Sequence, residues 1–170
     1  YISSGNPSGT LTIPEKLGGY TVTSIRGVDV NASTNARNIL GVTSSNTTIT
    51  KVIIPNTVTS IGNNTFSKFN ALTEIDIPDS VTNIEQYSFY NCQNLEKVNF
   101  ESSSNLTMIN NYAFNNCIKL EKFNMPNNVT SVGNYAFSKC TKLNELTLSN
   151  KLETIGDHAF YDDTEIANEL

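Results

Sequence analysis

A repeat of about 23 residues constrains this 170-residue chain more than any other feature. An aliphatic residue marks the start of each unit, at steps of 23, 23, 25, 23 and 23 residues. The marker residues are Ile49, Leu72, Leu95, Leu120, Leu143 and Ile166. The longer step reflects an insertion in the 101–105 region. Such self-similarity is the signature of a solenoid, in which each coil buries its apolar face against the next coil.

The first part of each unit alternates apolar and polar residues. In one unit, Leu72 is followed by Ile75 and Ile77, with Glu74 and Asp76 at the intervening polar positions. This i, i+2 spacing predicts a short parallel strand with one buried face. In three units a proline follows, where its missing N–H would end the strand ladder.

The second part of each unit carries another apolar pair, spaced by three, and then a phenylalanine. These phenylalanines are Phe66, Phe89, Phe114, Phe137 and Phe160, and we expect their rings to stack from coil to coil. The 110–117 segment contains helix-tolerant residues and has room for two turns. We therefore predict a short α- or 3₁₀-helix on the outer wall of each coil.

A glycine opens this outer segment in three units, at Gly62, Gly133 and Gly156. The equivalent position holds Glu85 or Asn110 in the other two units. A backbone that required positive φ would not accept Glu85. We therefore expect a tight corner that is not left-handed.

The charge of the chain excludes several kinds of partner. The formal net charge is -5 and the sequence pI is about 4.8, so the chain lacks the clustered Lys and Arg that bind phosphate backbones or anionic membranes. No apolar run approaches the roughly 18 residues of a membrane span. We expect no nucleic-acid partner and no membrane insertion by this segment.

Three cysteines, Cys92, Cys117 and Cys140, recur at the repeat spacing. The same column holds Phe69 in one unit and Asp163 in another. A column that accepts phenylalanine is an apolar core column, and parallel side chains on stacked coils seldom reach disulfide geometry. We predict buried free thiols, with no metal and no cofactor.

The remaining candidate chemistry is weak. His158 is the single histidine, and it occupies a variable position of the predicted helix. Histidine-assisted catalysis needs a nucleophile and an orienting acid beside the ring, so we predict that the chain is not an enzyme. The acidic residues Asp157, Asp162, Asp163 and Glu165 lack the spacing of a calcium loop. We expect them to form a solvated, charged end.

The outward positions of the predicted strands are the candidate partner-binding residues. They are Lys51, Ile53, Glu74, Asp76, Lys97, Asn99, Lys122, Asn124, Glu145 and Thr147. We expect ion pairs between these carboxylates and lysines on neighbouring coils. The same alternation of charge would equally keep an exposed sheet soluble and discourage edge pairing, and Ile53 is the single apolar anchor. The 28–48 segment, which has no repeat partner, is a second candidate binding site.

The unit beginning Leu120-Glu-Lys-Phe-Asn-Met-Pro126 and continuing with Val129, Val132-Gly133, Ala136-Phe137 and Cys140 resembles the BspA-type leucine-rich repeat. That family comprises bacterial and protozoan surface proteins. The resemblance implies a leucine-rich-repeat solenoid of α+β type, with strands on a concave face and helical segments on the outer wall. It also implies secretion or cell-surface display and adhesion to a protein or glycoprotein ligand. The alternative is a non-catalytic structural spacer or scaffold within a larger surface protein.

The resemblance covers residues 49–170, which we interpret as five repeats plus the start of a sixth. Residues 1–48 match less completely, and we expect an irregular N-terminal coil or cap with a loop insertion. The two parts are predicted to form one structural domain. Because the chain begins without Met and ends just after a repeat has begun, we expect it to be part of a longer protein.

Overall fold

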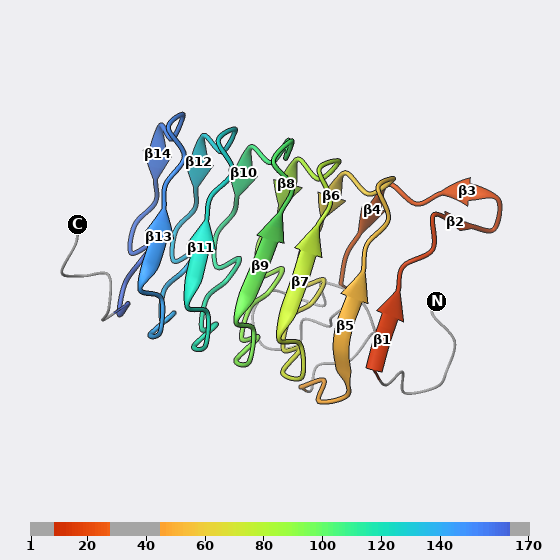
Figure 1. The fold of residues 1–170 in the computed structure, drawn as a ribbon, viewed down its shortest axis with the longest axis horizontal. Coiled ribbons are helices and arrows are strands. Elements are labelled where there is room, and N and C mark those ends of the chain that lie inside the picture. The colour runs from red at the N-terminus through yellow and green to blue at the C-terminus, as the bar shows by residue number, and fades with distance from the viewer. Residues whose placement is uncertain (1–8, 28–44, 164–170) are drawn as a thin grey trace.

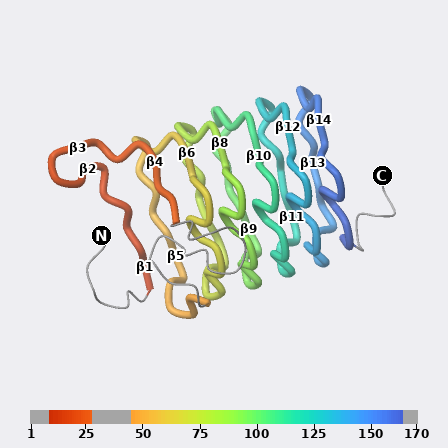
Figure 2. The backbone as a smooth tube through the Cα atoms, turned by 180° about the vertical axis from the view of Figure 1, so that it is seen from behind, coloured from red at the N-terminus to blue at the C-terminus, as the bar shows by residue number. Residues whose placement is uncertain are grey.

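Each repeat forms one coil of a solenoid, and the coils stack side by side along one axis (Figure 1). The computed structural model describes residues 9–27 and 45–163. Each coil contributes a strand to one side, a two-residue strand to a second side and a series of turns to the third. Figure 2 shows the same stack from behind, with neighbouring coils running parallel along its whole length.

The longer strands lie on one side of the stack and are parallel. They are β1 (Gly9–Thr12), β5 (Ile49–Ile53), β7 (Glu74–Ile77), β9 (Lys97–Phe100), β11 (Lys122–Asn124) and β13 (Glu145–Thr147). Alternate residues are buried, as the i, i+2 pattern predicted. We call the outer side of these strands the strand face. It consists of two separate sheets, β1–β5 and β7–β9–β11–β13.

The two-residue strands form a second, continuous sheet. They are β4 (Ser24–Ile25), β6 (Ser60–Ile61), β8 (Asn83–Ile84), β10 (Met108–Ile109), β12 (Ser131–Val132) and β14 (Thr154–Ile155). All neighbours in this sheet are parallel and in register, so that Ile61 pairs with Ile84 and Ile84 pairs with Ile109. This continuous sheet holds neighbouring coils together, including the two coils between which the strand face is interrupted.

The N-terminal coil follows the same course, since β1 pairs with β5 and β4 pairs with β6. Between them lies a hairpin of β2 (Lys16–Leu17) and β3 (Tyr20–Thr21), which projects away from the stack in Figure 1. The division of the chain at residue 48 stays a prediction. Most of the 28–48 segment, and the sixth repeat expected from Ile166, lie outside the described residues.

The predicted helix on the outer wall is wrong, because the described residues contain no helix and the wall consists of overlapping turns. In these turns the Thr65 N–H donates to Gly62 O and the Phe69 N–H donates to Phe66 O. Two wall residues in a coil, four positions apart, have positive φ, a conformation that a right-handed helix does not accommodate. These residues are Asn64, Lys68, Tyr87, Asn91, Tyr112, Asn116, Tyr135, Lys139, His158 and Asp162. The fold is therefore a β-solenoid rather than an α+β protein.

Hydrogen bonds between coils replace those of the predicted helix. The Phe66 N–H donates to Ser88 O at 2.8 Å, and the Phe89 N–H donates to Ala113 O at 2.8 Å. The Phe114 N–H continues the series to the next coil. Because these N–H groups point along the solenoid axis, the wall works as a further ladder between coils.

The core contains the stacked phenylalanines that the sequence predicted. Phe89 and Phe114 are parallel with ring centroids 4.9 Å apart, and Phe114 and Phe137 follow at 5.3 Å. The glycine corner is also as expected, since Gly62, Gly133 and Gly156 do not have positive φ. That corner is tight, because a Cβ added to Gly133 would lie 2.5 Å from the backbone nitrogen of Asn111.

Candidate functional site

All ten candidate binding residues lie on the strand face and are exposed. They form two columns, because the strands from β7 to β13 pair in register. The Glu74 column continues through Lys97 and Lys122, and the Asp76 column continues through Asn99. The structure therefore brings these residues onto one surface, because alternate side chains of a strand point to the same face of the sheet.

The Asn99 side chain organises the middle of this surface. Its Nδ2 donates to Glu74 Oε1 at 2.7 Å and to Asp76 Oδ1 at 2.8 Å. One neutral amide thus bridges two carboxylates on the neighbouring strand, and both of its donor hydrogens are used. This arrangement fixes the side-chain rotamers and lowers the repulsion between the carboxylates.

The expected ion pairs are found at one place within the described residues, where Lys122 Nζ lies 2.6 Å from Glu145 Oε2. The prediction was wrong for Glu74 and Asp76, which accept hydrogen bonds from Asn99 instead. Register alone does not explain this, because Lys97 is paired in register with Glu74 on one side and with Lys122 on the other, yet the described residues show no ion pair between Lys97 and Glu74. At this exposed site the Lys122–Glu145 pair contributes at most about 1 kcal/mol to stability.

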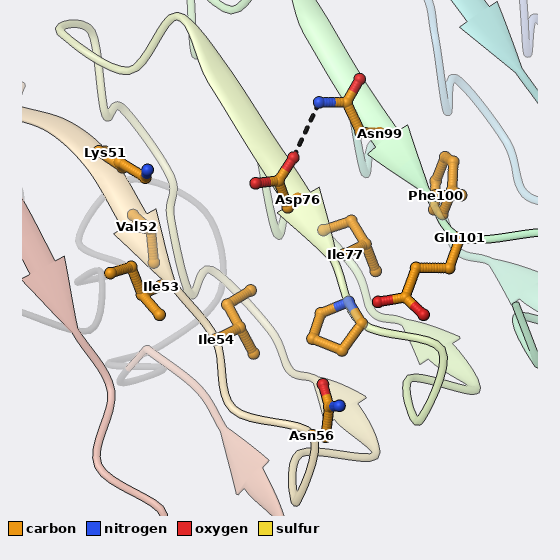
Figure 3. A pocket seen from close by; sticks show the side chains of 11 residues that line it. Lys51, Val52, Ile53, Ile54, Asn56, Asp76, Ile77, Asn99, Phe100 and Glu101 are labelled. Carbon is orange, nitrogen blue, oxygen red and sulfur yellow. Dashed lines mark hydrogen bonds between the residues drawn. The ribbon is translucent and has the colours of Figure 1, made fainter.

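The strand face is interrupted between β5 and β7, which are not hydrogen-bonded neighbours. A pocket of about 460 Å³ lies there, and we call it the sheet-break pocket (Figure 3). It is lined by Lys51, Val52, Ile53, Ile54, Asn56, Asp76, Ile77, Pro78, Asn99, Phe100 and Glu101. Four of the ten predicted residues take part in it. The sequence did not indicate the pocket, because identical columns do not encode the spacing between coils.

A second, smaller depression of about 330 Å³ lies further along the strand face. Its lining includes Lys97, Lys122 and Glu145 together with Glu96 and Glu121. The lining is mostly charged, and β9 and β11 pair there through a single residue pair. The strand face is thus hollowed at two places where the ladder between coils is weak or absent.

The three cysteines are fully buried free thiols, which confirms the prediction. Each Sγ lies near a backbone carbonyl of the preceding coil, as Cys117 Sγ does at 3.3 Å from Phe89 O. Burial raises the pKa of Cys92 to about 12 and raises that of Cys117 well above its ordinary value. Such thiols are poor nucleophiles and poor metal ligands. Within residues 9–27 and 45–163, no three His, Cys, Asp or Glu side chains are grouped as metal ligands.

His158 ends a row of stacked aromatic rings on the outer wall. The rings of Tyr87, Tyr112 and Tyr135 are stacked in turn, and His158 lies on Tyr135 with centroids 4.9 Å apart. The rings of His158 and Tyr161 also meet edge to face, with their centroids 5.4 Å apart. The histidine is exposed, and its contacts are those of a stack rather than of a nucleophile and an acid. Sequence reasoning missed this row because it assigned the position to a helix.

The charged end differs from the prediction at Asp163, which is 2% exposed. Its Oδ1 accepts a hydrogen bond from the Cys140 N–H at 2.7 Å, and its Oδ2 is buried without a partner. Burial raises the pKa of this carboxyl group to about 7. Asp157 and Asp162 are exposed as expected, and Glu165 lies outside the described residues. Asp163 takes the place of a cysteine in the core column.

Comparison with known families agrees with this geometry. The family model of the BspA-type leucine-rich repeat region matches residues 38–167 in six copies. The chain belongs to this family. No curated protein matches the chain significantly. Within the described residues, no helix is long and apolar enough to cross a membrane.

Solved leucine-rich repeat structures share the fold of this BspA-type chain. A leucine-rich repeat protein of T. pallidum is 21% identical, with a TM-score of 0.62 over 95% of this chain and 57% of that chain. One from Eubacterium ventriosum is 24% identical, with a TM-score of 0.58 over 95% of this chain and 44% of that chain. The BspA-type chain thus spans about half the length of these structures. At this identity the likeness shows the fold alone.

Proposed function

We propose that this BspA-type chain is a protein-binding or adhesion module of a secreted or cell-surface protein. Its strand face would be the surface that contacts a protein or glycoprotein ligand. The observation that carries the proposal is the arrangement of ten exposed side chains in two columns on one side of the solenoid, with a pocket at the sheet break. Extended solenoid surfaces of this kind suit macromolecular ligands.

The energetics of the strand face fit a binding role. Asn99, Glu74 and Asp76 hold one another in place, so that less side-chain entropy is lost when a partner binds. Ile53 is 44% exposed, and an exposed apolar side chain beside polar groups is a typical anchor at an interface. Secretion or cell-surface display is inferred from the family, and no catalytic role is proposed.

The test neutralises the charges of the strand face and measures attachment to host cells and to matrix proteins. The variant combines Glu74→Gln, Asp76→Asn, Lys97→Gln and Lys122→Gln. We expect attachment to fall by about tenfold or more, because several interface contacts are lost together. The matched control combines Glu153→Gln, Asp157→Asn, Lys119→Gln and Lys139→Gln, which are exposed residues away from the two columns.

Loss of attachment in both variants, or in neither, would contradict the strand-face proposal. The second candidate function, a structural spacer, is favoured by the fact that several strand-face groups satisfy one another, as in the Lys122–Glu145 ion pair. A spacer predicts unchanged attachment in both variants. It also predicts that a longer or shorter solenoid changes the reach of a neighbouring domain.

A further inference from the structure

Three departures from the repeat pattern meet at the sheet-break pocket. The strands β5 and β7 on its two sides are not hydrogen-bonded neighbours. Ile53 places an exposed aliphatic side chain in a column that otherwise holds Asp76, Asn99, Asn124 and Thr147. Glu101 stands where the neighbouring coils have proline, at the start of the 101–105 insertion. Irregularities that coincide in space, in an otherwise regular stack, indicate a specific role.

The chemistry of this pocket combines apolar walls with carboxylates. Ile53, Ile77 and Phe100 line it together with Asp76 and Glu101 (Figure 3). One oxygen of Asp76 accepts the Asn99 hydrogen bond, which leaves its second oxygen for a ligand. The Glu101 carboxylate has no hydrogen bond or ion pair with any residue of the described part of the chain. In Figure 3 the Glu101 side chain extends from the end of β9 back toward β7, over the pocket.

We propose that the sheet-break pocket binds an arginine side chain of a partner polypeptide. This inference rests on the proposed binding function and names the chemistry of the contact. The aliphatic stem of an arginine would pack on Ile53, whose side chain is exposed, as long cationic side chains do on apolar surface. Its planar guanidinium group would pair with Glu101 and Asp76 and lie beside the Phe100 ring.

Charge and shape select arginine over other side chains. An acidic side chain would meet two carboxylates, and a neutral apolar one would desolvate them without a partner. A lysine would supply charge as a single point, without the planar donors that serve two acceptors at once. Lys51 lines the β5 side of the pocket (Figure 3) and would repel a cation there, so the guanidinium group would bind on the side of Glu101. The net charge of -5 also favours a basic partner.

The test uses three small amides as probes, titrated into isotopically labelled protein and followed by NMR chemical shifts. They are N-acetyl-arginine amide, the neutral isostere N-acetyl-citrulline amide and N-acetyl-lysine amide. We expect the arginine amide to bind with a dissociation constant on the order of 1 mM, which is typical of so small a ligand. Its shifts should centre on the ends of β5, β7 and β9. The citrulline and lysine amides should bind at least several-fold more weakly.

Two variants locate the contact. Glu101→Gln removes the free carboxylate and should weaken arginine amide binding about tenfold. Ile53→Thr should weaken it several-fold by removing the apolar wall. Threonine is chosen because Thr147 occupies the equivalent position of another coil. Glu121→Gln is the matched control, because it removes an exposed carboxylate outside the sheet-break pocket, and it should leave binding unchanged. All three residues are exposed, so the fold should be retained.

Equal binding of the citrulline or the lysine amide would overturn the proposal. Shifts centred elsewhere, or equal weakening by Glu101→Gln and Glu121→Gln, would overturn it as well. A failure of this test leaves the attachment experiment unaffected, because that experiment measures the whole strand face with macromolecular ligands. Conversely, arginine amide binding without attachment would contradict the adhesion role while retaining the pocket.

Discussion

The rings of Tyr87 and Tyr112 lie stacked with their centroids 4.9 Å apart, although both residues have positive φ, of 59° and 57°. For a residue with a Cβ, this left-handed conformation costs roughly 1–2 kcal/mol relative to the right-handed one. Tyr135 continues the stack at 5.0 Å, so the interior rings are stacked on both faces. Each contact of this kind returns about 0.5–1.5 kcal/mol, which offsets the backbone strain. The row of rings therefore helps the wall to keep its unusual backbone.

Substitution of Tyr112 distinguishes this wall from a helix. Tyr112→Ala and Tyr112→Gly remove the same two ring contacts, but only glycine relieves the strain at positive φ. We expect the alanine variant to be less stable than the glycine variant by about 1 kcal/mol, measured as the free energy of unfolding in guanidinium chloride. In a helix interior, glycine would be the less stable of the two by a similar amount. That opposite order would contradict the wall seen in the structure.

The phenylalanine stack should be most sensitive at its centre. Phe114 is fully buried and contacts Phe89, Phe123 and Phe137, whereas Phe160 at the C-terminal end is half-buried and contacts Phe137. Phe114→Ala should lower the free energy of unfolding by about 3–5 kcal/mol, because a cavity forms between coils. Phe160→Ala should cost clearly less. Equal losses, measured by denaturant unfolding, would mean that the coils do not share one stacked core.

Much of this fold could be predicted from the sequence because burial columns depend on residue type alone. Phe89, Leu95 and Cys117 occupy their expected buried positions, since apolar side chains at a fixed period have one way to leave water. The wall was missed because the prediction considered whether the residues tolerate a helix and whether two helical turns fit. The observed backbone instead needs residues with positive φ. A signal was present, as Asn91, Asn116 and Asp162 share a column and these residue types tolerate that conformation.

The candidate site was predicted in the same uneven way. The exposure of Glu74 and Asp76 follows from alternation along a strand, which the sequence shows directly. Their bonding to Asn99, and the break between β5 and β7, depend on the distance and register between coils. The residue types at equivalent positions of the repeats carry no information about that distance. Ile53 was noted as the one apolar residue among the ten candidates, but its place beside a pocket was not predicted.

The buried thiols should be protected until the protein unfolds. Cys92, Cys117 and Cys140 are fully buried, and burial raises their pKa values, to about 12 for Cys92. We expect no reaction with a thiol-labelling disulfide reagent at pH 8 in the native state, and three labelled thiols per chain in denaturant. Labelling followed by mass spectrometry checks this. Rapid labelling of the native protein would show that the cysteine column is open to solvent.

The buried Asp163 carboxyl group should make stability depend on pH. Burial raises its pKa to about 7 in the folded state, from the ordinary value of 3.8 that applies when the chain is unfolded. The folded state then binds the proton more tightly, so the stabilisation is complete below pH 3.8 and is lost as the pH rises through about 7.

Asp163→Asn keeps an oxygen that can accept the Cys140 N–H hydrogen bond and cannot ionise. Its unfolding free energy should therefore fall less between pH 4 and pH 7 than that of the original chain, with Asp157→Asn as the exposed control. If the unfolding free energies of the original chain and of Asp163→Asn changed in parallel with pH, burial would not raise the pKa of this carboxyl group.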